Sequence, residues 1–305
     1  MGKLIATSNC PFDLTPWQDM DIESVHAGVG AVMAITSTGH ALQMTTNIAT
    51  SYQSWYWHNI RSLSMSKVIP GAAIGLHQDG TCVLTQNPIQ LDLSRHWDSR
   101  PYFMKSWFGS VRHQVHEWRD IVQVEMADAI FALDRNGRVH HACLPYPYEE
   151  KDWFKEADSW RDIVRIATGP QNALFGITSD GRVMATGGNP ENNGLKDALA
   201  TFSDVADLCV TGAESNHAYL LKKDGKVYNG FGEVKELPPV GGDGYPVFGS
   251  HFNYLVLVRA RNGKLFPLDC NTDWLAEVRN WPPVRTFSMG YTDIYGSPFV
   301  VAITE

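Results

Sequence analysis

The sequence predicts an all-β fold: a seven-bladed β-propeller whose ring is closed by pairing of the N- and C-terminal strands in one blade. Three observations predict it. A short hairpin unit recurs along the whole chain, most units are about 40 residues long, and the two chain ends supply the halves of one further unit. A period of about 40 residues is typical of one propeller blade.

Each recurring unit is an apolar strand, a turn that ends in glycine, and a second strand. In five of the six turns the glycine follows Asp or Asn, and in the first it follows Thr38. Asp-Gly or Asn-Gly between apolar runs indicates a hairpin, because a type I′ turn requires positive φ at both central residues. We therefore expect type I′ turns at these glycines. They are Gly39, Gly80, Gly137, Gly181, Gly225 and Gly263.

A second motif precedes the hairpins, with the pattern aromatic-x-x-apolar-x-x-apolar. Trp160, Ile163 and Ile166 form one copy. We expect the apolar residues to open a strand and the aromatic residue to pack between neighbouring units. The other copies are Trp57/Ile60/Leu63, Trp118/Ile121/Val124, Phe202/Val205/Leu208 and Trp281/Val284/Phe287, with a looser one at Trp17/Ile22.

The seventh unit is divided between the chain ends. Residues 299–305 (FVVAITE) match the strand before a turn, and residues 1–9 (MGKLIATSN) match the strand after one. With the ends joined, Gly263 and Gly2 are 44 residues apart, as in other units. Closure of the ring would remove exposed sheet edges.

Several strands are apolar on both faces, as in 173–177 (ALFGI), which suits blades packed face to face. A parallel sheet covered by helices is the alternative, but the long amphipathic helices that it needs are missing from the sequence. We expect one domain over 1–305. Its predicted blades are 17–54, 55–100, 118–150, 160–201, 202–240, 241–280, and 281–305 with 1–10.

Residues 160–169 (WRDIVRIATG), followed by 173–195, resemble a repeat of the regulator of chromosome condensation family. The resemblance is good over 118–142, 160–195 and 202–230 and thinner elsewhere, since several units lack the family's Gly-x-Asn-x-x-Gly tail. It implies a seven-bladed propeller. Family members act as exchange factors for Ran-type small GTPases, as a plant UV-B receptor, as bacterial inhibitors of secreted enzymes and as scaffolds. The receptor's repeated Gly-Trp-Arg-His-Thr is absent, so we do not expect photoreception.

The unit between Gly80 and Gly137 has 57 residues, about 16 more than the others, and the excess lies within 90–117. Insertions in repeat arrays usually form loops on a binding face, and Trp, Tyr and Arg dominate interface hot spots. We therefore predict a protein-binding site there. Its residues are His96, Trp97, Arg100, Tyr102, Phe103, Trp107, Phe108 and Arg112. The alternative is an outer strand that packs Trp97, Phe103 and Trp107 on the blade.

Composition narrows the class of partner. The net charge is -8, which argues against nucleic-acid binding, and no run of 18 apolar residues indicates a membrane span. The five cysteines lack a CxxC pair, so we expect free thiols. No signal peptide is evident after Lys3. We expect a cytoplasmic monomer that binds a protein.

Catalytic motifs are missing from the sequence: it has no G-x-S-x-G, P-loop or complete G-x-G-x-x-G. His113 and His116 could lie near each other, but no third metal ligand is indicated, and Glu149, Glu150 and Asp152 suit a solvated loop. We therefore expect no cofactor or metal, and a non-catalytic scaffold or regulator. Two alternatives are nucleotide exchange on a Ran-type small GTPase and an enzyme with a polar site at the channel mouth.

Overall fold

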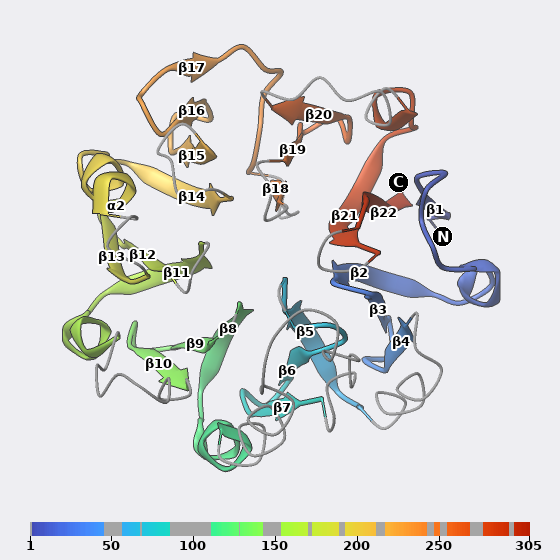
Figure 1. Cartoon of the computed structure of the whole chain (residues 1–305), viewed down its shortest axis with the longest axis horizontal. Coiled ribbons are helices and arrows are strands. Elements are labelled where there is room, and N and C mark those ends of the chain that lie inside the picture. The colour runs from blue at the N-terminus through green and yellow to red at the C-terminus, as the bar shows by residue number, and fades with distance from the viewer. Residues whose placement is uncertain are drawn as a thin grey trace.

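The computed structural model shows seven small antiparallel sheets arranged as a closed ring around a central axis (Figure 1). This confirms the predicted seven-bladed propeller. Described in it are residues 2–45, 57–67, 69–85, 111–127, 129–142, 154–169, 173–188, 193–211, 217–242, 247–250, 255–268, 277–292 and 296–305.

Each blade has its first strand nearest the axis and its later strands successively farther out (Figure 1). Blades 1 to 4 are β2 (Ile22–Gly28), β3 (Ala31–Thr36), β4 (Ala41–Thr45); β5 (Ile60–Met65), β6 (Ala73–His77), β7 (Cys82–Leu84); β8 (Ile121–Met126), β9 (Ile130–Asp134), β10 (Val139–Ala142); and β11 (Ile163–Thr168), β12 (Ala173–Thr178), β13 (Val183–Gly187). Blades 5 to 7 are β14 (Val205–Val210), β15 (Ala218–Lys222), β16 (Val227–Asn229), β17 (Val234–Lys235); β18 (Phe248–Ser250), β19 (Val256–Arg259), β20 (Leu265–Leu268); and β21 (Val284–Tyr291), β22 (Pro298–Thr304), β1 (Leu4–Ala6).

Short helices lie at the rim of the ring, between blades (Figure 1). Most of these helices end just before the aromatic residue of the aromatic-x-x-apolar-x-x-apolar motif. This explains why the motif recurs at the junctions between blades. The helices are η1 (Thr15–Trp17), η4 (Lys155–Ser159), α2 (Asn193–Ala200) and the helical residues 111–117 and 277–279.

The chain ends close the ring as predicted. β1 pairs antiparallel with β22, with Leu4 opposite Ile303 and Ala6 opposite Val301, and β22 pairs in turn with β21. Figure 1 shows the two termini beside each other in blade 7. The first and last strands therefore complete one sheet, and the hydrogen-bonded pairing ties the N-terminal segment that leads into blade 1 to the end of the chain.

The type I′ prediction for the turns is wrong. Gly181 has φ of +86°, but Asp180 does not share the positive φ that type I′ requires. Gly181 N donates to Thr178 O (2.8 Å) and Thr178 N to Arg182 O (3.0 Å), which defines a three-residue loop with a glycine bulge. The residue before glycine has another role: Asp224 Oδ1, for example, accepts from Lys226 N (2.9 Å). Asp and Asn are thus favoured by side-chain capping, not by left-handed backbone.

The same turns join neighbouring blades. Gly181 O accepts a hydrogen bond from Val205 N (2.9 Å), the first residue of the next blade, and Ser179 N donates to Asp162 O (2.9 Å). Asp162 has φ of +59°, and Asn59, Asp120 and Asp204 have equivalent values before their own blades. Asp and Asn tolerate this backbone better than other side chains, which explains why they recur there.

The core is divided into seams between adjacent blades. Trp160 shows the pattern, because it packs with Phe131 and Val139 of blade 3 and with Ile163 of blade 4. A Cβ on Gly176 would lie 2.9 Å from the Trp160 ring, so the indole requires glycine beneath it. The aromatic residues therefore pack between units as predicted. Equivalent seams form around Trp17, Trp57, Trp118, Phe202 and Trp281, and a further one contains Tyr219.

Candidate functional site

The predicted site in the 90–117 insertion falls mostly outside the described residues. This holds for seven of its eight residues: His96, Trp97, Arg100, Tyr102, Phe103, Trp107 and Phe108. Arg112 is described. It is half-buried, and its Nη2 donates to Thr85 O (3.1 Å) at the end of blade 2. This bond ties Arg112 to the framework of the ring.

The helical residues 111–117 belong to the regular repeat. Val111 and Val115 are buried in the seam between blades 2 and 3, in the same cluster as Trp118. Helical residues also precede Trp160 and Trp281, so this helix is the local version of a common element. The extra residues of this long unit must lie before Val111.

Histidine and acidic side chains lie close together at several places in the described part of the chain, but not in sets that suit a metal. His113 lies 3.4 Å from Glu117, and both side chains are exposed. His140 and His141 point to different carboxylates, Asp134 (3.1 Å) and Asp158 (3.2 Å). No group of three or more His, Cys, Asp or Glu side chains suits a metal ion among the described residues. Glu149, Glu150 and Asp152 lie outside them.

The central channel contains four charged residues from different blades. Arg165 of β11 forms an ion pair with Asp207 of β14, with Nε 2.5 Å from Oδ1. Lys67, which follows β5, donates from Nζ to Ser250 Oγ at the end of β18 (2.6 Å). Glu125 of β8 accepts from Gln123 Nε2 (3.1 Å). The positive charges of the two basic side chains thus equal in number the two carboxyl groups beside them.

Burial shifts the pKa values of the carboxyl groups in this channel. Removal from water raises the pKa of Glu125 and that of Asp207, and Lys67 and Arg165 partly oppose the rise. Burial also raises the pKa of the Cys209 thiol to about 11 and lowers that of His26 to about 4. At neutral pH the thiol therefore stays protonated and His26 stays neutral. A protonated thiol is a poor nucleophile.

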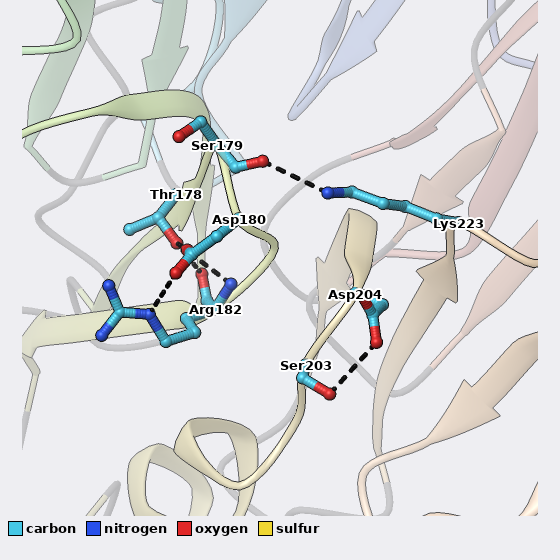
Figure 2. Close-up of polar contacts among 7 residues, drawn as sticks. All are labelled: Thr178, Ser179, Asp180, Arg182, Ser203, Asp204 and Lys223. Carbon is cyan, nitrogen blue, oxygen red and sulfur yellow. Dashed lines mark hydrogen bonds and ion pairs between the residues drawn. The ribbon is translucent and has the colours of Figure 1, made fainter.

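One side of the ring carries the hairpin turns between the second and third strands of the blades, and we call it the turn face. Figure 2 shows it between blades 4 and 5. Lys223 Nζ donates to Ser179 O (3.2 Å) in the neighbouring blade, and Arg182 Nε lies 2.8 Å from Asp180 Oδ2. Thr178 Oγ1 donates to Asp180 Oδ1 within the turn. The face is therefore ordered by short polar contacts and presents exposed charges of both signs.

Two exposed valines lie at equivalent positions on this face. Val122 of β8 is 40% exposed and Val164 of β11 is 57% exposed. Each is the residue skipped by a β-bulge directly after the first residue of an inner strand. Bulges re-aim side chains, and here they turn the valines outward from a buried strand. The equivalent bulge positions of blades 1 and 2 hold Glu23 and Arg61 instead.

Comparison with known proteins supports the architecture. The sequence matches no protein-family model and no curated protein. The solved structures with a similar fold include two of yeast Prp20. One is Prp20p from Saccharomyces cerevisiae, described with its binding properties to Gsp1p and histones (TM-score 0.56, 13% identity, 95% of this chain and 84% of that one). The other is yeast RCC1 (Prp20) bound to Kap60 (TM-score 0.56, 14% identity, 95% and 82%).

The fold is an RCC1-like β-propeller. At this level of identity the likeness extends to the fold alone. In the described part of the propeller, no helix has the length and apolar character to cross a membrane. Cys10, Cys82 and Cys209 are free thiols, as predicted, and Cys143 and Cys270 lie outside the described residues.

Sequence reasoning missed two features of this RCC1-like propeller. The valines had a signal, because Ile121-Val122 and Ile163-Val164 put a large apolar residue where blades 1, 2 and 7 have Glu23, Arg61 and Arg285. The contact of Lys67 with Ser250 had none, since the two residues are 183 positions apart.

Proposed function

We propose that the chain is a non-catalytic, protein-binding propeller, a scaffold or regulator of a partner protein. It binds through the turn face together with the 90–117 insertion. The observation that carries this proposal is the exposure of Val122 and Val164 (40% and 57%). Exposed apolar side chains on a rigid, polar-rimmed surface favour a protein partner.

The channel supports the same conclusion. Arg165 and Asp207 neutralise each other, and Lys67 is bonded to Ser250. Polar groups that satisfy one another stabilise the ring and are poorly disposed to act on a substrate. The similarity in fold to Prp20p, whose binding to Gsp1p and histones is described, is consistent with protein recognition.

A capture experiment tests the proposal. Immobilised chain is exposed to lysate, and bound proteins are identified for the wild type, for Val122→Ser/Val164→Ser, and for Trp97→Ala/Tyr102→Ala/Trp107→Ala. Met20→Ser is the matched control, because Met20 is 43% exposed. We expect both multiple variants to lose the same protein and the control to retain it, with thermal unfolding unchanged. Equal capture by all four proteins would reject this binding surface.

Nucleotide exchange on a Ran-type small GTPase is the second candidate. The similarity to Prp20p favours it, as does the long unit between blades 2 and 3. Release of fluorescent GDP from a panel of small GTPases, with and without the chain, is the test. Acceleration for one GTPase would support exchange activity, and unchanged release across the panel would reject it.

A further inference from the structure

The hairpin turns of the turn face share one hydrogen bond, which makes their positions comparable from blade to blade. In blade 4, Thr178 N donates to Arg182 O (3.0 Å), and in blade 5, Lys222 N donates to Lys226 O (3.0 Å). The other five blades make the same bond, in blade 7 between the two chain ends. The residue that supplies the carbonyl therefore occupies an equivalent place in all seven blades.

This place is cationic in five consecutive blades. Blades 1 and 2 have His40 and Thr81 there, whereas blades 3 to 7 have Lys or Arg. These cations, which we call the cationic arc, are Arg138, Arg182, Lys226, Lys264 and Lys3. All except the half-buried Lys264 are exposed. In a chain of net charge -8, one face of the ring thus carries a positive side chain on each of five neighbouring blades.

Most of the cationic arc keeps its charge unneutralised. Three of its members have no side-chain hydrogen bond or ion pair within the residues that the structure describes: Arg138, Lys226 and Lys3. Lys264 Nζ donates to Trp281 O (2.6 Å), and a neutral carbonyl leaves the positive charge in place. Arg182 does meet a carboxylate, with Nε 2.8 Å from Asp180 Oδ2 (Figure 2). Because an exposed ion pair is weak, Arg182 too is available to a partner.

The cationic arc lies next to the two exposed valines. Arg135 N donates to Asp120 O (2.9 Å), so the turn of blade 3 rests on the segment that leads into Val122. The turn of blade 4 makes the equivalent bond to the segment that leads into Val164. Arg135 is itself exposed, and its guanidinium has no partner in the described part of the chain. Blades 3 and 4 thus place apolar side chains and positive charge on the same surface.

Carboxylates on the same face restrict the kind of anion that fits. Asp120, Asp162 and Asp204 are exposed before the inner strands of blades 3 to 5. Blade 1 is acidic, with Asp21 and Glu23 exposed and no Lys or Arg in its turn at 36–40. A nucleic acid or an anionic membrane presents negative charge everywhere, and these carboxylates would repel it. A protein segment can place its carboxylates against the cationic arc alone.

We propose that the partner of the turn face binds through a segment that combines acidic and apolar side chains. Its carboxylates pair with Arg135, Arg138 and Lys226, and its apolar residues cover Val122 and Val164. This partner chemistry depends on the proposed function, because it describes what the turn face binds. Complementary charge raises the association rate and disfavours partners of the wrong sign. The acidic blade 1 would repel the same segment, so the charges also select one orientation on the ring.

Synthetic peptides test this chemistry without any variant of the chain. Fluorescence anisotropy is measured on the full chain with labelled peptides of one length, in which the residues between fixed leucines are Glu, Gln or Lys. We expect the Glu peptide to bind at least about tenfold more tightly than the Gln peptide, and the Lys peptide to bind weakest. The preference should shrink between about 50 and 300 mM salt. Equal binding of the Glu and Gln peptides, or no binding of either, would overturn the proposal. So would tighter binding of single-stranded DNA or of phosphatidylserine vesicles.

A charge reversal tests the role of the cations. Arg135→Glu/Arg138→Glu/Lys226→Glu changes three exposed side chains that have no partner in the described part of the chain, so thermal unfolding should be unchanged. The Glu peptide should bind this variant at least about tenfold more weakly than the wild type. Lys155→Glu, at an exposed lysine of the rim helix η4, is the matched control and should bind as the wild type does. Equal binding by all three proteins would overturn the role of these cations.

Capture of the partner separates this proposal from the proposed function. Loss of the captured protein by Val122→Ser/Val164→Ser and by the triple charge variant, with capture by Lys155→Glu, supports the acidic segment. If only the valine variant loses the protein, the turn face binds a partner and the acidic segment is wrong. Capture by both variants would reject the binding surface itself.

Discussion

Lys67 Nζ lies 2.6 Å from Ser250 Oγ, and the hydrogen bond between them connects blade 2 with blade 6 across the central channel. Figure 1 shows β5 and β18 on opposite sides of the ring centre. Contacts between adjacent blades hold each seam, whereas this bond spans the ring. The ammonium group also lies near the Glu125 carboxyl, where its charge offsets part of the rise in pKa that burial causes.

We predict that Lys67→Met destabilises the propeller by about 1.5–3 kcal/mol, the usual value for a hydrogen bond to a charged group. The variant removes the bond to Ser250 and one of the two cations near Glu125, leaving Arg165. The measurement is the free energy of unfolding in urea. Lys226→Met, at an exposed lysine of the turn face, is the control and should change stability little. Equal stability of the two variants would show that the bond to Ser250 contributes nothing.

Glu125→Gln is expected to stabilise the fold at neutral pH. Burial raises the pKa of Glu125 above its ordinary value of 4.5, so the folded state disfavours the carboxylate. The wild type therefore gains stability as the pH falls through the raised pKa toward 4.5, and the advantage of the variant should disappear over that range. Thermal unfolding of both proteins from pH 7 to pH 4 is the measurement. An advantage that persists at low pH would contradict the assignment.

His26 gives a pH dependence of the opposite sign. Burial lowers its pKa from 6.5 to about 4, so the folded state binds its proton less readily than the unfolded state. Stability should fall as the pH decreases from 6.5 to about 4, by about 3 kcal/mol in total. His26→Gln should remove this part of the pH dependence and keep a hydrogen bond to Ser24. A histidine that titrates near 6.5 by NMR would refute the prediction.

Variants of Asp162 test the left-handed backbone conformation of the residue that precedes an inner strand. Its φ is +59°, a conformation that costs alanine about 1 kcal/mol more than glycine. Asp162→Ala should therefore be less stable than Asp162→Gly by about that amount, although glycine is the more flexible residue when unfolded. The two variants are compared by urea unfolding. The reverse order of stability would mean that the backbone at this position relaxes freely.

The ring could be predicted from the sequence because its evidence is local and repeated. Apolar strands, Asp-Gly or Asn-Gly turns and aromatic motifs recur in most units, and the end fragments match two halves of one unit. The turn type could not be predicted from the sequence, because Asp before glycine is compatible both with a type I′ turn and with a glycine bulge capped by the Asp side chain. Contacts across the channel depend on ring geometry and leave no local pattern, as with Lys67 and Ser250. The insertion had no repeat to guide it, so its residues remain a prediction.

Hydrogen exchange of the complex with the captured protein tests the central claim most directly. Amide exchange is compared for the free and bound chain, peptide by peptide. We predict slower exchange on binding in peptides that contain Val122 and Val164 and in the 90–117 insertion. Protection confined to the opposite side of the ring, with these peptides unchanged, would contradict binding through the turn face.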